Sequence, residues 1–419
     1  MQTARATSSC RSASSFRIHP ALFSHAEAAL ARLLTFAYPA DGVLSRYFRE
    51  HRNIGRQERA FIAETCFVVL RRLRTLSARA CPGESAATPR RLLLAALAGQ
   101  GRNLRELEHL LKRDEAAWLA AAKGFDDANL AVAERLDLPD WLYTRLLDVF
   151  AAETEALICA LNQSAPLDLR VNLLKSSREV VIEALKEEGF TVEAGKHSPF
   201  AVRLAEKPAL AGHPLFLAGH IEVQDEGSQL LGLMLAPRRG EVVADFCAGA
   251  GGKTLLLGML MKNTGRLYAF DIAAPRLEKL KPRLARSGLS NVHPICLDSA
   301  HNPKLKRLAG KMDRVLVDAP CSGLGTLRRN PYLKWRQTPD SVAGLAKKQA
   351  EILATAARLV RLGGRLLYAT CSLLPEENEE VVKAYQAAHP GWTLLEEQRF
   401  FPHTHGTDGF YAALMQREG

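Results

Sequence analysis

Two cysteines late in the chain are the side chains best suited to covalent chemistry. Cys321 stands in Asp-Ala-Pro-Cys-Ser-Gly after the apolar run 314–317, and Cys371 stands in Thr-Cys-Ser after the run 366–369. A thiolate that forms a covalent intermediate divides one difficult step into two easier ones. A lone cysteine in such a place is most often a small buried core residue. Two of them, each at a strand end and beside a turn, indicate a thiol active site.

A glycine-rich segment upstream predicts a cofactor site. Gly249, Gly251 and Gly252 follow the apolar strand 242–246 and precede a helix that begins at Lys253. Glycines let the backbone turn sharply and approach a ligand closely at the N-terminus of a helix. The segment has neither the Gly-x-Gly-x-x-Gly pattern nor the phosphate-binding Gly-x-x-x-x-Gly-Lys-Ser/Thr pattern. A methyl donor without phosphate therefore fits it better than a dinucleotide, which stays open as the alternative.

Three further acidic residues end predicted strands and favour the same cofactor. Asp271 ends the strand after the glycine loop, where a carboxylate can accept hydrogen bonds from both hydroxyls of a ribose. Asp298 ends the third strand and can meet an adenine edge, and Asp318 ends the strand before Cys321. S-adenosylmethionine carries ribose and adenine without phosphate, so it is the cofactor we expect.

A thiolate beside a methyl donor has a specific use. Carbon 5 of a pyrimidine is too weak a nucleophile to take a methyl group directly. When a thiolate adds to carbon 6, carbon 5 becomes enamine-like and can attack a methylsulfonium. Loss of the carbon 5 proton then expels the thiolate. Asp318 is placed to stabilise charge on the edge of the ring.

The segment between the two cysteines is rich in cations and aromatic rings. Cations suit phosphate contacts, and aromatic rings suit stacking with bases. A target base within structured RNA also has to leave its stack to reach such a site. A solvated surface loop is the alternative. The candidate RNA-binding residues are Arg328, Arg329, Lys334, Trp335 and Arg336.

Composition and charge point to a soluble protein with a polyanionic partner. The 419 residues carry a formal net charge of +11, which favours nucleic acid before a membrane surface. No apolar run approaches the roughly 20 residues that a membrane span needs. The eight cysteines form no Cys-x-x-Cys pair or zinc-like cluster, so we expect free thiols, no metal and a cytoplasmic location. No heptad pattern suggests assembly, so we expect a monomer without an obligate protein partner.

The order of apolar patterns predicts a tail and three domains. Residues 1–18 are rich in Ser, Ala and Arg and read as a disordered tail, with a transit peptide as the alternative. Residues 19–150 carry helical stripes and predict an all-α domain. Residues 151–235 predict a small α+β module whose size suits an RNA-recognition-like fold. In residues 236–419, strands and helices alternate over short connections, which predicts an α/β domain with a parallel, doubly wound sheet.

From about residue 160 onward the sequence resembles the RsmB/Sun family of RNA cytosine-5 methyltransferases. This resemblance implies a Rossmann-like class I methyltransferase sheet and 16S rRNA as the substrate. The helical N-terminal part is similar to the NusB-like domain of the bacterial rRNA member. The motifs that carry the resemblance are Leu169-Arg-Val-Asn172, Gln224-Asp-Glu226, Asp245-Phe-Cys-Ala-Gly-Ala-Gly-Gly-Lys253, Asp271 with Arg276, Asp298, Asp318-Ala-Pro-Cys-Ser-Gly323, Arg329-Asn-Pro331 with Lys334-Trp335, Thr370-Cys-Ser372 and Gly406-Thr-Asp-Gly-Phe410.

The resemblance also implies roles for individual residues. Cys371 would be the nucleophile that adds to carbon 6, Cys321 would assist product release, and Asp318 would lie near the cytosine. The implied contacts of S-adenosylmethionine are Cys247, Ala248, Gly249, Ala250, Gly251, Gly252, Lys253, Asp271, Arg276, Asp298 and Asp318. The loop departs from the family at Cys247-Ala-Gly-Ala, where a proline is common, and this should soften the turn. A non-catalytic RNA-binding or ribosome assembly factor on the same fold is the alternative function.

Overall fold

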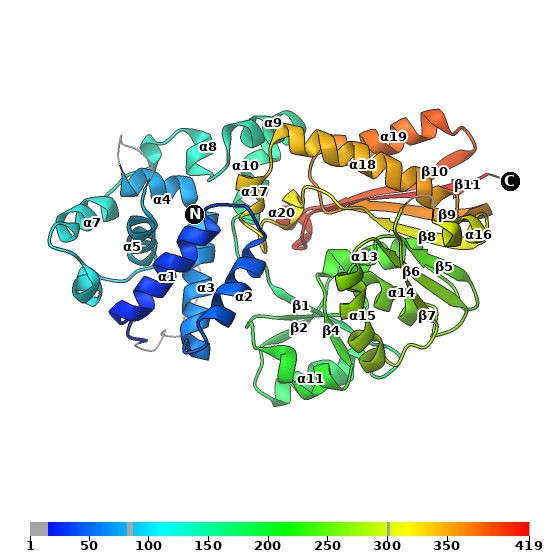
Figure 1. Cartoon of the computed structure of the whole chain (residues 1–419), viewed down its shortest axis with the longest axis horizontal. Helices are drawn as coiled ribbons and strands as arrows, with labels where there is room; N and C mark the ends of the chain where they lie inside the picture. Colours follow the sequence, from blue (N-terminus) through cyan, green and yellow to red (C-terminus); the bar gives the residue numbers. More distant parts are fainter. Residues whose placement is uncertain (1–15, 82–86, 300–301, 419) are drawn as a thin grey trace, which may run out of the picture. The chain divides into compact units, whose positions relative to one another are not determined.

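The computed structural model of the chain describes residues 16–81, 87–299 and 302–418 (Figure 1). Contacts divide the chain into one unit that ends at Leu138 and another that begins at Pro139. The predicted tail, residues 1–18, lies almost wholly outside the described residues. The division predicted from sequence, at 150 and 235, remains a proposal. No described helix is long and apolar enough to cross a membrane.

The described residues of the first unit form helices and short 3-10 turns, as the apolar stripes predict. The first helix shows why these segments begin where they do: His19 accepts a hydrogen bond from the Leu22 backbone N–H, and Pro20 takes the first helical turn. The elements are α1 (Pro20–Leu33), α2 (Ala40–Glu50), α3 (Arg56–Arg71), α4 (Leu73–Ala80), α5 (Pro89–Gly99), α6 (Leu104–Leu107), η1 (Glu108–Leu110), α7 (Glu115–Lys123), η2 (Asp127–Asn129) and α8 (Val132–Arg135).

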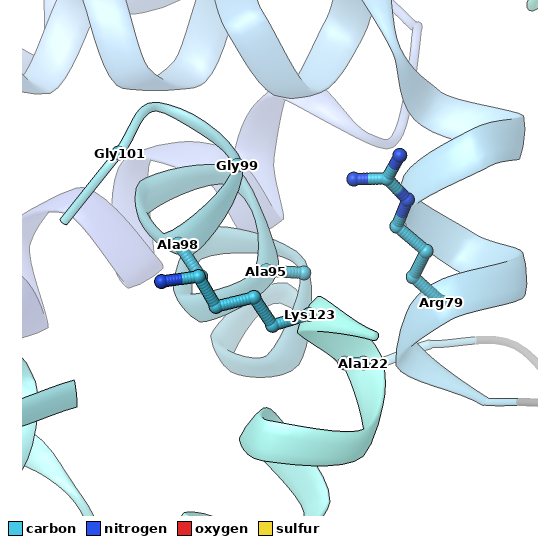
Figure 2. Close-up of a pocket in the computed structure, with 7 residues that line it drawn as sticks. All are labelled: Arg79, Ala95, Ala98, Gly99, Gly101, Ala122 and Lys123. Carbon is cyan, nitrogen blue, oxygen red and sulfur yellow. The ribbon is translucent and has the colours of Figure 1, made fainter. Parts of the chain in front are cut away.

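A hollow of about 340 Å³ lies between α4, α5 and α7 of this unit. Small residues of α5 and Ala122 of α7 line it, and the side chains of Arg79 and Lys123 lie on either side of it (Figure 2). The Arg79 guanidinium donates to both carboxylate oxygens of Asp127, at 2.9 and 2.5 Å. The charge of Arg79 is therefore already balanced within the protein.

The second unit begins with helices and a small antiparallel sheet in the order β2-β3-β1-β4. Strands β1 to β4 and helix α11 agree with the small α+β character predicted for this region. Apolar residues of β1, β3 and α11 pack into one cluster with Leu256 and Met259 of helix α14 (Gly252–Leu260). The elements are α9 (Asp140–Phe150), η3 (Ala151–Glu153), α10 (Thr154–Leu161), β1 (Leu167–Val171), α11 (Arg178–Glu187), β2 (Val192–Ala194), β3 (Ala201–Leu204), η4 (Leu210–Gly212), α12 (Pro214–Leu217), β4 (Ile221–Val223) and α13 (Glu226–Leu235).

The rest of the second unit is built on a seven-stranded sheet in the order β10-β11-β9-β8-β5-β6-β7. The elements are β5 (Val242–Asp245), α14 (Gly252–Leu260), β6 (Arg266–Asp271), α15 (Ala274–Ser287), β7 (Val292–Cys296), α16 (Pro303–Leu308), β8 (Met312–Asp318), η5 (Leu324–Thr326), α17 (Leu333–Arg336), α18 (Pro339–Ala357), β9 (Val360–Thr370), η6 (Pro375–Glu377), α19 (Glu379–Ala388), β10 (Trp392–Phe400), α20 (Pro402–His405) and β11 (Phe410–Arg417).

The strand directions confirm the doubly wound sheet and correct one part of it. Strands β5 to β9 pair in parallel, but β11 runs antiparallel to both β9 and β10. The prediction of a purely parallel sheet is therefore wrong at its C-terminal edge. The connection between β10 and β11 is short and contains only α20, which does not allow the long crossover that a parallel neighbour needs.

Helices cover both faces of the large sheet (Figure 1). On one face, apolar residues of α16, α18 and α19 pack against β8 and β9, with Leu353 and Val382 among the buried side chains. On the other face, α13, α14 and α15 pack against β5, β6 and β11, with Leu231 and Leu255 in the core. The central strands β5, β8 and β9 are thus buried on both sides, as parallel strands require.

Candidate active site

The carboxyl ends of the central strands bring the predicted motifs to one edge of the sheet. Strand β5 lies between β6 and β8, and β8 pairs with β9. The chain leaves β5 towards β6 on one side and returns to β8 on the other, so this edge holds the topological switch point, where ligands bind in such sheets. Asp245, Asp271, Asp318 and Thr370 are the last residues of these four strands.

The two predicted cysteines meet at this edge. The Sγ atoms of Cys321 and Cys371 lie 3.3 Å apart, and both residues are partly buried. The hydrogen bond with Cys371, burial, and the negative charges of Cys371 and Glu377 raise the pKa of Cys321 well above the ordinary value of a thiol. Cys321 therefore keeps its proton at neutral pH and can donate its S–H to the Cys371 sulfur.

The glycine loop leaves open space at one position and is tightly packed at another. Gly249 has φ +57°, and a side chain there would meet no atom within 4 Å. Gly251 has φ +88°, and a Cβ there would lie 2.1 Å from Leu280. Only glycine fits position 251, because both its backbone conformation and its packing exclude a side chain. The open side of Gly249 is where a ligand can approach the backbone.

Two arginines hold the carbonyl groups of this loop, and sequence reasoning missed both. Arg170 of β1 donates to the Gly252 carbonyl at 2.7 Å, and Arg283 of α15 donates to the Ala250 carbonyl at 2.6 Å. Burial lowers the pKa of Arg170 to about 10, which still leaves it charged at neutral pH. The small sheet therefore supports the glycine loop directly. The motif Leu-Arg-Val-Asn that contains Arg170 was noted in the sequence, but its target was not.

The strand-end acids differ in their surroundings. Asp271 is buried and accepts hydrogen bonds from the backbone N–H groups of Gly249, at 2.8 Å, and Ala273, at 2.7 Å. Asp298 is exposed, and hydrogen bonds led by the Asn302 amide lower its pKa. Arg276 is also exposed, near the start of α15. Asp298 and Arg276 are thus open to solvent while Asp271 is buried, and the contacts of all three with a cofactor stay a prediction.

Asp245 is a fourth acid at this edge, and it was not among the residues predicted to contact the cofactor. It is 1% exposed, its Oδ2 accepts from the Thr254 hydroxyl at 2.7 Å, and its Oδ1 has no hydrogen-bond partner among the described residues. Burial, with a smaller contribution from the charge of Asp318, raises the pKa of Asp245 to about 7. A buried acceptor left without a donor is unusual in a folded protein and suits a site that binds a ligand.

An ion pair joins the glycine loop to the strand that precedes Cys321. The Lys253 Nζ lies 2.7 Å from Asp318 Oδ2 and 5.7 Å from the centre of the Phe410 ring. Burial alone would lower the pKa of Lys253, but the Asp318 carboxylate outweighs it and the net pKa is raised. Cys247, in the same loop, is partly buried, and burial raises the pKa of its thiol. Cys247 is thus an inert neighbour and not a second nucleophile.

The predicted RNA-binding segment is partly buried. Arg328 and Lys334 are buried, at 7% and 0% exposure, so their cationic groups do not face solvent. Lys334 donates to Asn162 at 3.0 Å. Trp335 is half-buried beside the Lys334 ammonium, at 5.1 Å from Nζ to the ring centre. Arg336 is the member of this set that is exposed.

Arg328 and Arg329 belong to a charge network inside the protein. Arg329 donates to Asp408 Oδ2 at 2.6 Å and to Asp225 Oδ2 at 2.9 Å, and Arg328 lies 3.2 Å from Asp408. Burial and the charge of Asp408 raise the pKa of Asp225 to about 6. These arginines tie the segment after Cys321 to α13 and to the loop before β11. In the structure both arginines pair with carboxylates of the same chain, and their contact with RNA stays a prediction.

Comparison with known proteins identifies the family. Residues 232–416 match the family model described as 16S rRNA methyltransferase RsmB/F, and residues 138–211 match the ferredoxin-like domain of RsmF/B-like methyltransferases. The probable ribosomal RNA small subunit methyltransferase B of Synechocystis sp. is 36% identical over 326 residues, which cover 74% of this chain and 73% of the relative. The ribosomal RNA small subunit methyltransferase B of Sodalis glossinidius is 37% identical over 304 residues, which cover 70% and 69%.

A solved structure supports the same conclusion. The crystal structure of PH0851 matches with a TM-score of 0.80 and 28% identity, and the match covers 96% of this chain and 99% of that one. The crystal structure of a methyltransferase homolog protein from Pyrococcus horikoshii matches with a TM-score of 0.61 and 29% identity, over 68% of this chain and 97% of that one, which confirms the Rossmann-like methyltransferase fold. The family match spans the glycine loop, the strand-end acids and both cysteines, and the chain belongs to the RsmB/Sun family of 16S rRNA methyltransferases.

Proposed function

We propose that this protein transfers a methyl group from S-adenosylmethionine to carbon 5 of a cytosine in 16S rRNA, with Cys371 as a covalent catalyst. The observation that carries this proposal is the pair of cysteine sulfurs 3.3 Å apart at the switch point of the sheet. A methyltransferase that modifies an oxygen or nitrogen atom needs no thiol, because those atoms are nucleophilic enough. Paired thiols suit a carbon acceptor that has to be activated first.

In the forward direction the Cys371 sulfur adds to carbon 6, and the electrons of the carbon 5–carbon 6 double bond become available at carbon 5. Bound S-adenosylmethionine would supply the methyl group that carbon 5 then takes. Asp318 stands at the end of β8, where it can interact with the edge of the ring. Lys253 holds the Asp318 carboxylate in place through their 2.7 Å contact.

Release of the product reverses the addition of the thiol. Carbon 5 loses its proton to a water molecule, the double bond forms again, and the bond between carbon 6 and Sγ breaks with its electrons returning to Cys371. Cys321 keeps its proton because its pKa is raised, and its sulfur lies 3.3 Å from the leaving one. We therefore assign to Cys321 the donation of a hydrogen bond that stabilises the departing thiolate. This division of labour agrees with the one that the family resemblance implies.

The residues around the glycine loop fit S-adenosylmethionine. Each carboxylate oxygen of Asp271 accepts one backbone N–H and keeps capacity for a second donor such as a ribose hydroxyl. Gly249 has open space on its side-chain face, and Asp245 Oδ1 lacks a donor among the described residues. The carboxylates of Asp271 and Asp318 would also favour the positive charge of a sulfonium. A dinucleotide would bring phosphate groups against these two acids, which disfavours that alternative.

The identity of the product tests the proposal. Unmodified 16S rRNA is incubated with the purified protein and methyl-labelled S-adenosylmethionine, then digested to nucleosides and analysed by mass spectrometry. The proposal predicts label in 5-methylcytidine. Label in another base or in ribose would contradict the assignment of carbon 5. No label, together with no binding of the cofactor in calorimetry, would favour an RNA-binding assembly factor.

A further inference from the structure

Glu377 is a buried carboxylate that contacts both cysteine-bearing loops. It ends η6 and is 0% exposed. Its Oε1 accepts from the Ser322 backbone N–H at 2.8 Å, and its Oε2 accepts from the Ser322 hydroxyl at 2.5 Å. The Ser372 hydroxyl also donates to Oε2. Ser322 directly follows Cys321, and Ser372 directly follows Cys371.

The rest of the environment fixes Glu377 itself. The Gln349 amide of α18 donates to Oε1 at 2.9 Å, and the Tyr368 hydroxyl of β9 donates to the Glu377 carbonyl at 2.6 Å. Four donors thus converge on the two carboxylate oxygens. Buried polar groups of this kind are held in one geometry by their hydrogen bonds.

This arrangement couples the two loops through one side chain. The loops leave neighbouring parallel strands, β8 and β9, and are 50 residues apart in sequence, from position 321 to position 371. The two serine hydroxyls lie 3.1 Å apart on the same carboxylate oxygen. Because each serine is adjacent to its cysteine, a shift of either serine moves the neighbouring sulfur.

We propose that Glu377 is a positioning residue for the methyl transfer reaction, which sets the distance between the Cys321 and Cys371 sulfurs by binding Ser322 and Ser372. This inference rests on the proposed function of the two cysteines. Glu377 makes no contact with either sulfur among the described hydrogen bonds, so it acts through the serines. The charge of Glu377 also contributes to the raised pKa of Cys321. The substitutions described next separate this effect of charge from the positioning of the sulfurs.

Two substitutions at position 377 distinguish geometry from charge. Glu377→Ala removes all four contacts. Glu377→Gln removes the charge but can keep the geometry. Its amide oxygen can accept from the Ser322 N–H and from Gln349. Its amide N–H₂ can donate to the two serine hydroxyls, which rotate to accept. The double variant Ser322→Ala/Ser372→Ala cuts the side-chain links and keeps the carboxylate. Glu376→Gln is the matched control, because Glu376 pairs with Arg145 at 2.8 Å and makes no hydrogen bond to Ser322 or Ser372 in the described part of the chain.

The readouts are kcat and KM for 16S rRNA, S-adenosylmethionine affinity by calorimetry, and protein–RNA adduct on a denaturing gel. A misplaced reactive group costs roughly 100-fold in rate. We therefore expect Glu377→Ala and the double serine variant to lose about 100-fold in kcat, with KM and cofactor affinity near wild type. They should also accumulate adduct, because Cys321 no longer reaches the departing sulfur. Glu377→Gln should retain kcat within about tenfold of wild type.

Each other outcome has a distinct meaning. If the double serine variant binds cofactor normally and turns over at the wild-type rate without adduct, the positioning role is wrong. If Glu377→Gln is as inactive as Glu377→Ala, the charge and not the geometry is what matters, which also overturns the inference. Cys321→Ala is run alongside: if it traps no adduct and Cys371→Ala stays active, the proposed function itself has failed.

Discussion

Lys253 of the glycine loop and Asp318 at the end of β8 form an ion pair whose Nζ and Oδ2 atoms lie 2.7 Å apart. The pair is largely shielded from solvent, with side-chain exposures of 14% and 29%. It links the predicted cofactor site to the strand that carries Cys321. Removing one partner leaves the other charge poorly compensated. This lowers the free energy of unfolding more than removing both partners does.

A double-mutant cycle measures this link. Lys253→Met and Asp318→Asn should each lower the free energy of unfolding, and the double variant should lose less than the sum, with a coupling energy of about 1–3 kcal/mol. Thermal unfolding of the four proteins gives the value. Lys281→Met is the control, because the Lys281–Glu278 pair is 64% exposed on both sides and should contribute almost nothing. Additive effects at Lys253 and Asp318 would show that the pair is not coupled.

Asp245 predicts a pH dependence of stability. Its pKa in the folded protein is about 7, raised by burial from an ordinary value of 3.8. The folded state therefore keeps a proton that the unfolded state releases, and stability falls as pH rises from about 4 to about 7. The total loss amounts to at most about 4 kcal/mol. Asp245→Asn cannot ionise, so its melting temperature should exceed that of wild type at pH 8 and approach it at pH 4.

Asp313 serves as a control, because its contribution to stability should change with pH in the opposite direction to that of Asp245. Burial would raise its pKa, but the Val242 N–H and Arg361 outweigh burial and lower it. The stabilisation from Asp313 is present above its unfolded pKa and is lost as pH falls, so Asp313→Asn should cost stability at pH 8. If Asp245→Asn were equally destabilising at pH 4 and pH 8, the ionisation of Asp245 would not be the cause.

Arg329 separates a structural role from an RNA-binding role. It binds both Asp225 and Asp408, and its charge opposes the burial and the repulsion that raise the pKa of Asp225 to about 6. Arg329→Gln should raise that pKa further, so the loss of melting temperature should be larger at pH 8 than at pH 5. A phosphate contact predicts instead an unchanged melting temperature and a smaller salt dependence of RNA binding.

Arg336 is the cation of the predicted RNA-binding set that faces solvent. Arg336→Gln should weaken binding to a 16S rRNA fragment and lower the slope of log affinity against log salt by about 1. Fluorescence titrations at several salt concentrations give this slope. Lys311 is an exposed control at the start of β8, the end opposite Asp318, and Lys311→Gln should leave the slope unchanged. Equal slopes for all three proteins would remove Arg336 from the interface.

The meeting of Cys321 and Cys371 was predictable because parallel strands end at one edge of a sheet. The network of Arg328 and Arg329 was not, because an arginine in a loop has the same sequence appearance whether it binds phosphate or a carboxylate. Its partner Asp408 lies about 80 residues away, so the pairing depends on the fold. Glu377 was also hidden, since an acid after a turn is typical of a solvent-exposed helix start.

The antiparallel hairpin of β10 and β11 was not predicted, for a different reason. Strand β10 is an edge strand whose residues are mostly exposed, so it shows no alternation of apolar and polar residues. Strand β11 has a continuous apolar run from Phe410 to Met415, which is typical of a buried strand but does not show its direction. Only the pairing partners decide whether such a strand runs parallel or antiparallel.

Comparing two cysteine variants on a denaturing gel tests the central claim most directly. Each purified protein is incubated with S-adenosylmethionine and labelled 16S rRNA, and both label transfer and protein–RNA adduct are measured. We predict that Cys371→Ala forms neither product nor adduct, and that Cys321→Ala accumulates an adduct that survives denaturation. Methyl transfer by Cys371→Ala at the wild-type rate would contradict covalent catalysis by Cys371.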